Sequence, residues 1–196
     1  MPETDRLNGG LAARPDAILR ATPNLMTVLE IARDLALPDW MIVSGAIYQP
    51  VLNHLTGRPL DIGIKDYDLA YFDASDLSYE AEDAVIQRAA AAFDPPLRDK
   101  VEVRNQARVH LWFEDHYGEA FAPLSCSAEA LSRFTAPLFA VGARLEPDGR
   151  MHLEAPFGLD DLFGLRLRPN PSHPTRGFEG TAQRAVARWP EVKVDP

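Results

Sequence analysis

GIKDYDLAYFD, residues 63–73, is the segment from which both the fold and the chemistry can be inferred. Alternation and aromatic enrichment predict a strand over residues 66–72, so Asp66 and Asp68 would point to the same face, about 7 Å apart. Two such carboxylates repel each other unless a cation lies between them, and oxygen ligands favour a hard ion such as magnesium. The alternative is a pair of solvated acids at the exposed start of a strand.

A predicted strand-to-helix junction precedes this segment. Residues 40–43 form an apolar run typical of a buried strand, and residues 47–55 are predicted to be helical, with Ser44, Gly45 and Ala46 between them. A glycine there allows a ligand to approach the backbone closely, and a helix N-terminus offers free N–H groups to a phosphate. A glycine that serves only a tight turn would give the same pattern.

Glu102 lies on another predicted strand, residues 100–104, in which valine alternates with charge. If this strand neighbours the Asp66 strand, Glu102 completes a site of three carboxylates. Three carboxylates can hold two magnesium ions about 3.5–4 Å apart, which is the geometry for in-line displacement at phosphorus. Mn²⁺ is an alternative ion for the same oxygen ligands. An isolated surface glutamate is the other interpretation of Glu102.

Three cationic side chains near these acids are candidates for phosphate contacts. Lys65 precedes Asp66 directly, and Arg104 and Arg108 follow Glu102. The forked guanidinium of arginine suits phosphate. Lys65 fits a simple pairing with an acid equally well, and the two arginines also fit the solvated start of a helix.

Helical and strand patterns are mixed along the whole chain, so the fold class is α/β (α+β). We expect a loose N-terminal tail over residues 1–14 and a single domain over residues 15–196. Besides the elements above, the pattern predicts helices over residues 22–37, 78–93, 105–117, 127–134, 159–167 and 178–189, and a hairpin over residues 139–153.

The composition limits the partners. Acidic residues outnumber basic ones by 29 to 20, for a net charge of −9, which argues against strong binding of nucleic acid. A nucleotide bound through metal ions is compatible with this charge. The N-terminus does not read as a signal peptide, and no apolar run approaches the roughly 20 residues that a membrane span needs. We therefore expect a cytoplasmic protein without a membrane partner.

Several strings in the sequence resemble a bacterial nucleotidyltransferase-like family of uncharacterised substrate, within the superfamily typified by DNA polymerase β. They cover most of the chain from residue 40 to residue 171, and together they are specific, although only GIKDYDLAYFD is distinctive alone. The strings are VSGAIYQPVLNHLTGRP (43–59), GIKDYDLAYFD (63–73), VEVRNQARVHLWFE (101–114), APFGLDDLF (155–163) and RPNP (168–171).

The resemblance implies a mixed sheet with helices packed on one face, and a triphosphate bound at the strand-turn-helix around Gly45. It implies that Asp66 and Asp68 bind two metal ions, and that a third carboxylate, matched here by Glu102, holds the catalytic one. In the superfamily, a hydroxyl of an acceptor attacks the α-phosphorus of a nucleoside triphosphate and pyrophosphate leaves. The sequence identifies neither the nucleotide nor the acceptor, which is a small molecule or a macromolecule.

Two departures from the wider superfamily concern nucleotide binding. Ala46 stands where many members have serine, and Asp66 follows Gly45 by 21 positions (66 − 45), a longer gap than usual. They motivate an alternative, a catalytically inactive binding or regulatory protein on the same fold. A phosphatase or glycosyltransferase with an Asp-x-Asp motif is disfavoured, because the apolar residues here follow the acids instead of preceding them.

Overall fold

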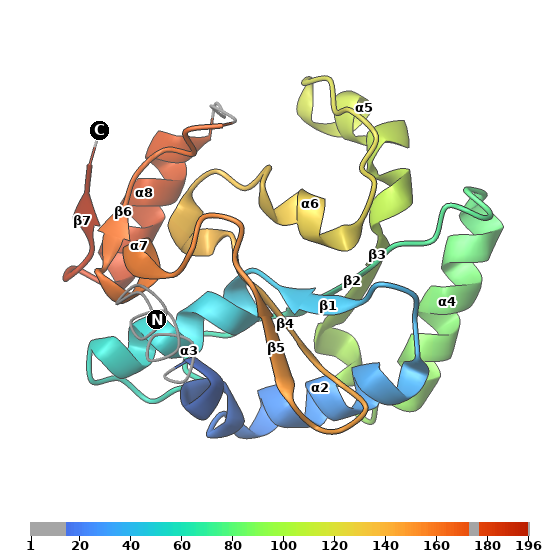
Figure 1. Cartoon of the computed structure of the whole chain (residues 1–196), viewed down its shortest axis with the longest axis horizontal. Coiled ribbons are helices and arrows are strands. Elements are labelled where there is room, and N and C mark those ends of the chain that lie inside the picture. The colour runs from blue at the N-terminus through green and yellow to red at the C-terminus, as the bar shows by residue number, and fades with distance from the viewer. Residues whose placement is uncertain (1–14, 173–176, 196) are drawn as a thin grey trace, which may run out of the picture.

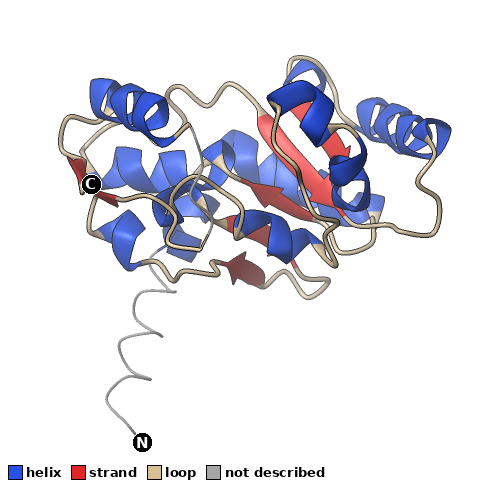
Figure 2. Ribbon diagram, turned by 90° about the horizontal axis from the view of Figure 1, so that it is seen from above, coloured by secondary structure: helices blue, strands red, loops and turns tan. Residues whose placement is uncertain are grey.

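The computed structural model describes residues 15–172 and 177–195, so the predicted tail over residues 1–14 lies outside the described part. Its centre is a five-stranded sheet in the order β3-β2-β1-β4-β5, surrounded by helices (Figures 1 and 2). The predicted mixed α/β class is confirmed. The strands are β1 (Met41–Val43), β2 (Tyr67–Tyr71), β3 (Val101–Asn105), β4 (Gly142–Leu145) and β5 (Met151–Glu154).

Within this sheet, strand pairing is antiparallel except between β2 and β3. Parallel neighbours need a long crossover, and α4 (Tyr79–Ala92) supplies it. Ser78 caps this helix, because its hydroxyl accepts a hydrogen bond from the backbone N–H of Ala81 at 3.2 Å. The crossover brings the third predicted carboxylate strand directly beside the Asp-x-Asp strand.

The main core lies between one face of the sheet and the helices α2 (Pro23–Leu35), α3 (Gly45–Leu55) and α4. Figure 1 shows α2 running along this face and α4 at the end of the sheet that carries β2 and β3. Alternation along β2 sends Tyr67, Leu69 and Tyr71 into this core, where each is at most 3% exposed. The intervening residues of β2 therefore face the other side of the sheet.

The opposite face carries a smaller apolar cluster, formed by Met41, Val43, Ala70, Leu131 and Ala140. Short elements cover it only in part: η2 (Gln106–Leu111), α5 (Phe113–Tyr117) and α6 (Ser127–Leu131). The predicted helix over residues 105–117 is thus two short pieces, because the backbone of Trp112 (φ −129°, ψ −14°) leaves the helical conformation. This incomplete cover leaves room for a cavity above the sheet.

The C-terminal part packs against α3. It contains η3 (Pro137–Phe139), α7 (Asp160–Phe163), α8 (Phe178–Arg188) and a parallel two-stranded ribbon of β6 (Arg166–Leu167) and β7 (Lys193–Val194). The helix predicted over residues 159–167 is wrong beyond Phe163, because Leu165 has a positive φ of 53° that ends it. The remaining short helix is η1 (Arg98–Lys100), which leads into β3.

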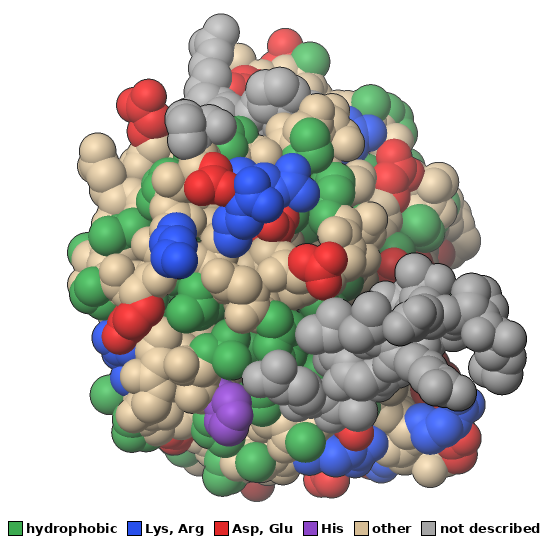
Figure 3. All heavy atoms as spheres, turned by 60° about the vertical axis from the view of Figure 1, so that its left-hand side comes forward, with side chains coloured by type: hydrophobic (Ala, Val, Ile, Leu, Met, Phe, Trp, Pro, Cys, Tyr) green, Lys and Arg blue, Asp and Glu red, His purple; other side chains and the backbone are tan. Residues whose placement is uncertain are grey.

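On the face that Figure 3 shows, basic side chains lie beside acidic ones and form no broad basic surface. Ion pairs also hold the C-terminal segment, with Arg58 paired to Glu191 at 3.0 Å and Arg166 paired to Asp195. In the described part of the chain, no helix combines the length and the apolar character that crossing a membrane requires.

Candidate active site

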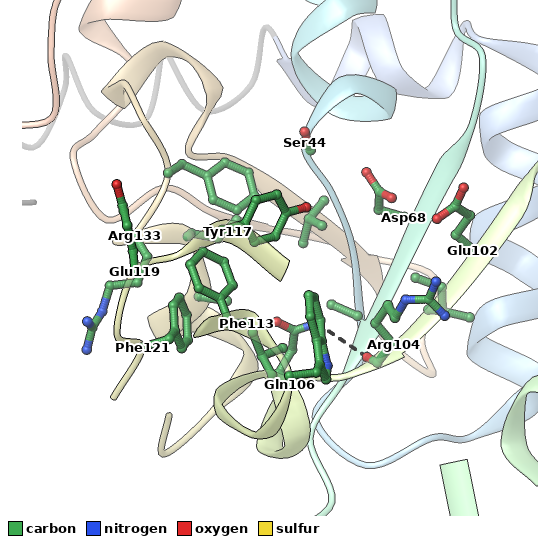
Figure 4. Close-up of a pocket in the computed structure, with 18 residues that line it drawn as sticks. Ser44, Asp68, Glu102, Arg104, Gln106, Phe113, Tyr117, Glu119, Phe121 and Arg133 are labelled. Atoms are coloured by element: carbon green, nitrogen blue, oxygen red, sulfur yellow. Dashed lines mark hydrogen bonds between the residues drawn. The ribbon is translucent and has the colours of Figure 1, made fainter. Parts of the chain in front are cut away.

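The parallel pairing of β2 and β3 places Asp68 and Glu102 side by side. Their Cα atoms are register partners, and both side chains project toward one cavity (Figure 4). Asp68 is half-buried on the inner strand, and Glu102 is exposed on the edge strand. Among the described residues, neither carboxylate has a hydrogen bond or an ion pair. The pair is therefore available to a ligand.

The surroundings of Asp68 disfavour its negative charge. Its pKa is raised from an ordinary value of 3.8 to about 6, and burial is the largest cause, because a carboxylate loses hydration there. The charges of Asp66 and Glu102 raise this pKa further, and Arg104 acts in the opposite direction. A divalent cation beside Asp68 would compensate the excess negative charge.

Asp66 lies one residue before β2 and is exposed. Its side chain lines a neighbouring hollow of about 390 Å³, together with Lys65 and Arg188, instead of the cavity of Asp68 and Glu102. Accordingly, the described residues contain no cluster of three His, Cys, Asp or Glu side chains that would enclose a metal ion. Two carboxylates nevertheless fit magnesium, which often takes only one or two from the protein and completes its shell with water and substrate phosphates.

The turn between β1 and α3 contributes Ser44 to the same cavity. The pattern predicted that Gly45 serves a close ligand approach or a tight turn, but the positive φ of the turn lies at Ser44 (φ 62°, ψ −131°). A non-glycine residue in such a conformation stores strain, which is found mostly at functional sites. Gly45 has no positive φ, and a Cβ there would meet only the end of the flexible Gln49 side chain, with Nε2 at 2.6 Å.

The first amides of α3 form the edge of this turn. Gly45 and Ala46 are its first two residues, and the first N–H groups of a helix have no partner within the helix. The positive end of the helix dipole points the same way. Three hollows meet around the turn, because the one lined by Ser44 and Tyr48 lies between the Asp68 cavity and the Asp66 hollow.

The three predicted phosphate-binding cations have different positions. Arg104 projects from β3 into the Asp68 cavity, and Lys65 lines the Asp66 hollow. Arg108 lies outside both and is buried. Its guanidinium pairs with the buried carboxylate of Glu82 and donates from Nε to the carbonyl of Leu77 at 2.9 Å. The structure therefore ties Arg108 to the fold through Nε and Nη1, and its role at a phosphate stays a prediction.

A comparison with known families decides the identity of this fold. A family model described as nucleotidyltransferase matches residues 30–194, which is most of the chain. The chain belongs to the nucleotidyltransferase family. The resemblance drawn from the sequence strings is thereby confirmed, and so is the fold that it implied.

A solved structure supports the same fold for this nucleotidyltransferase. An NMR structure described as revealing a CCA-adding enzyme head domain superposes on the chain with a TM-score of 0.74. The two share 24% sequence identity, and the match covers 92% of this chain and 94% of the other. At this level of identity the similarity concerns the fold alone. No curated protein matches the nucleotidyltransferase in sequence.

Aromatic residues of the cavity were not identified by the sequence analysis. Trp112, Phe113, Tyr117 and Phe121 line the cavity that Asp68 and Glu102 also line, which measures about 370 Å³. Figure 4 shows Phe113, Tyr117 and Phe121 opposite the two carboxylates. The signal was present as an unusual density of aromatic residues over residues 112–121. It could not be assigned to the site, because nothing local says that α5 packs over the sheet.

A second group of residues that the sequence analysis missed holds the loop before Asp66. Arg188 at the end of α8 donates from Nη1 to Oε1 of Gln49 at 2.8 Å and to the carbonyl of Gly63 at 3.2 Å. Its guanidinium also stacks on Trp189 at 4.2 Å. Asn53 of α3 holds the same loop, with Nδ2 donating to the carbonyl of Ile62 at 3.1 Å. Residues far apart in the sequence thus fix the position from which Asp66 enters β2.

Proposed function

We propose that this nucleotidyltransferase transfers a nucleoside monophosphate from a magnesium-bound nucleoside triphosphate to a hydroxyl group of an acceptor. The observation that carries the proposal is the juxtaposition of Asp68 and Glu102 in register on parallel strands, without protein partners, beside the N-terminus of α3. An acidic pair beside a group of backbone donors suits a ligand that combines cations with phosphates.

The reaction is a displacement at phosphorus. The acceptor oxygen forms a bond to the α-phosphorus, the bond from the α-phosphorus to the bridging oxygen breaks, and pyrophosphate leaves with that electron pair. The proton of the acceptor hydroxyl passes to water or to a nearby carboxylate. Divalent cations, when bound, neutralise the charge on the phosphates. Positioning and charge compensation are then the main contributions that the protein has to make.

Each side chain of the proposal has a separate task. Asp68 and Glu102 would hold the cation nearest the acceptor, and Asp66 would reach a second cation from the neighbouring hollow. The amides of Gly45 and Ala46, with the hydroxyl of Ser44, would bind phosphate oxygens. Lys65 and Arg104 would offset phosphate charge from the two sides of this turn.

Calorimetric titration tests the proposal. ATP, CTP, GTP and UTP are titrated into the wild type with Mg²⁺ and, separately, with EDTA. At least one triphosphate should bind with Mg²⁺, and Asp68→Asn should weaken that binding at least tenfold. Glu30→Gln, which removes an exposed carboxylate on α2, is the matched control and should change nothing. Equal binding with Mg²⁺ and EDTA would contradict the role of the carboxylates.

A second candidate is a nucleotide-binding protein without transfer activity. The separation of Asp66 from the cavity of the other two carboxylates favours it, as does alanine at position 46. Incubation with α-³²P-labelled triphosphate and measurement of pyrophosphate release distinguish the two. Magnesium-dependent binding without any pyrophosphate release, over a broad panel of hydroxyl acceptors, would support the binding protein.

A further inference from the structure

Four rings form one wall of the cavity that contains Asp68 and Glu102. We define the aromatic wall as Trp112, Phe113, Tyr117 and Phe121. Phe113 lies at its centre, with ring centroids 4.6 Å from Tyr117 and 4.5 Å from Phe121. Gly118 (φ 71°) ends α5 and turns the chain, which lets Phe121 return beside Phe113. The rings are therefore packed against one another instead of being scattered over the surface.

The aromatic wall is open on the side of the carboxylates. Tyr117 is 59% exposed, and the other three rings are half-buried. Figure 4 shows Phe113, Tyr117 and Phe121 across the cavity from Asp68 and Glu102. Clustered apolar surface that remains open beside polar groups marks a ligand site more often than a structural feature.

The aromatic wall lies on the Glu102 side of Ser44, and Phe113 and Tyr117 also line the intermediate hollow beside Ser44. Glu102 and Arg104 line the aromatic cavity, whereas Lys65 and Asp66 line the hollow beyond the intermediate one. Under the proposed function, the triphosphate extends from the N-terminus of α3 toward Lys65. A molecule on the aromatic wall then approaches the reacting phosphorus from the side of Glu102, which is where the attacking hydroxyl must come from in an in-line displacement.

We propose that the aromatic wall binds the acceptor, and that the acceptor is a small molecule with a planar aromatic ring and a hydroxyl group. This inference rests on the proposed function and adds the class of the second substrate. A cavity of about 370 Å³ suits a small molecule. The rings supply a stacking surface, which can bind any planar ring whatever hydrogen-bond donors and acceptors that ring carries.

Charge favours an acceptor without phosphates. The cavity lining carries three carboxylates, Asp68, Glu102 and Glu119, against the two guanidinium groups of Arg104 and Arg133. Arg133 also pairs with Glu129 at 3.3 Å and lies over the ring of Phe121 at 5.5 Å. With a net charge of −9 for the whole chain, a polyanionic acceptor would meet repulsion at this wall.

The test compares ring compounds with saturated counterparts. Uridine, tryptophol and 4-hydroxybenzyl alcohol are titrated into the full chain alongside ribose and cyclohexanemethanol, with binding followed by saturation-transfer NMR and calorimetry. The aromatic compounds should bind, and the saturated ones should bind at least fivefold more weakly. Tyr117→Ala should lower the affinity for the aromatic compounds about fivefold, and Tyr117→Phe should retain the affinity of the wild type. Tyr79→Ala, an exposed ring on α4 outside the cavity, is the matched control.

Magnesium-triphosphate binding is measured on the same variants, and it separates this inference from the proposed function. If Tyr117→Ala binds triphosphate as the wild type does but binds the ring compounds more weakly, the result supports the acceptor site. An equal loss of both would show that the wall holds the base of the nucleotide, and would overturn the inference while leaving the transfer reaction in place. Equal binding of saturated and aromatic compounds would also overturn it. A wild type that binds ring compounds but no triphosphate would remove the transfer reaction and the acceptor role with it.

Discussion

Asp68 on the inner strand β2 and Glu102 on the edge strand β3 are register partners with unequal access to water. The half-buried member carries the raised pKa, and the exposed member adds repulsion to it. At neutral pH and without a cation, the ionised carboxylate of Asp68 therefore destabilises the folded state. This effect can be measured in the free energy of unfolding and in the affinity for metal ions.

The free energy of unfolding should respond to Asp68 in a defined pH range. Because the folded pKa of about 6 exceeds the ordinary 3.8, the folded state retains a proton that the unfolded chain has released between these values. The metal-free protein therefore loses stability as pH rises from about 4 to above 6. At pH 7.5, Asp68→Asn should have a free energy of unfolding in urea that exceeds that of the wild type by on the order of 1–2 kcal/mol. At pH 4 the two proteins should have equal free energies of unfolding. Equal stability at both pH values would contradict this account.

Metal affinity should show the opposite pH dependence. Protons and cations compete for Asp68, so binding of Mn²⁺ should weaken as pH falls through about 6. We expect a loss of roughly tenfold between pH 7.5 and pH 5, measured by calorimetry. Asp68→Asn should bind weakly at both pH values and lose this dependence. Affinity that stays constant over the range would place the ion elsewhere.

Ser44 provides a test of backbone strain at the turn before α3. Glycine tolerates φ 62°, ψ −131°, so Ser44→Gly relieves the strain, although glycine also makes the unfolded chain more flexible. The net effect should be an increase of about 1 kcal/mol in the free energy of unfolding. Ser44→Ala retains the strain and should leave stability within about 0.5 kcal/mol. If the hydroxyl binds phosphate, both variants should weaken magnesium-triphosphate binding. Destabilisation by Ser44→Gly in urea unfolding would show that the conformation is not strained.

The buried pair of Arg108 and Glu82 should matter for folding and not for nucleotide binding. Arg108→Ala leaves Glu82 buried without its cation, which should cost about 3 kcal/mol of unfolding free energy. Triphosphate binding by the folded protein should be unchanged in calorimetry at low temperature. Arg33→Ala, which breaks an ion pair with the largely exposed Asp34, is the control and should cost less than about 1 kcal/mol. Lost triphosphate binding in folded Arg108→Ala would restore the phosphate contact that the sequence suggested.

Arg188 should act as a positioning residue for the loop before β2. Arg188→Ala removes the hydrogen bonds to Gln49 and Gly63, so amides of residues 57–66 should exchange with deuterium at least tenfold faster. Metal affinity should fall while affinity for aromatic compounds at the aromatic wall is retained. Arg20→Ala, which removes an exposed pair with Asp16, is the control. Unchanged exchange in this loop would show that Asn53 alone holds it.

The sequence predicted those parts of the fold that depend on local periodicity. The strand at 66–72, the helix at 78–93 and the valine-rich strand at 100–104 all exist within two residues of their predicted bounds, because each has a clear alternation or a capping residue. The adjacency of Asp68 and Glu102 was a hypothesis that the β2–β3 register now confirms. The roles of these residues in binding metal remain a prediction.

Features that depend on contacts between distant segments were not predictable. The sequence gives Arg104 and Arg108 similar surroundings, yet one faces the cavity and the other pairs with Glu82, 26 positions earlier. The positive φ of Ser44 accompanies a contact with a distant segment, since its N–H donates to the carbonyl of Val141, just before β4, at 3.0 Å. Local propensity alone places such strain at the neighbouring glycine.

The contact of Arg188 with the loop before Asp66 joins segments that are far apart in the sequence. The strands that carry Asp68 and Glu102 end by residue 105, whereas Arg188 lies 83 positions later (188 − 105).

 A chain shortened before α8 would keep both carboxylate strands but would lack the side chain that fastens the Asp66 segment. We therefore expect the position of Asp66 to depend on whether α8 is present and docked.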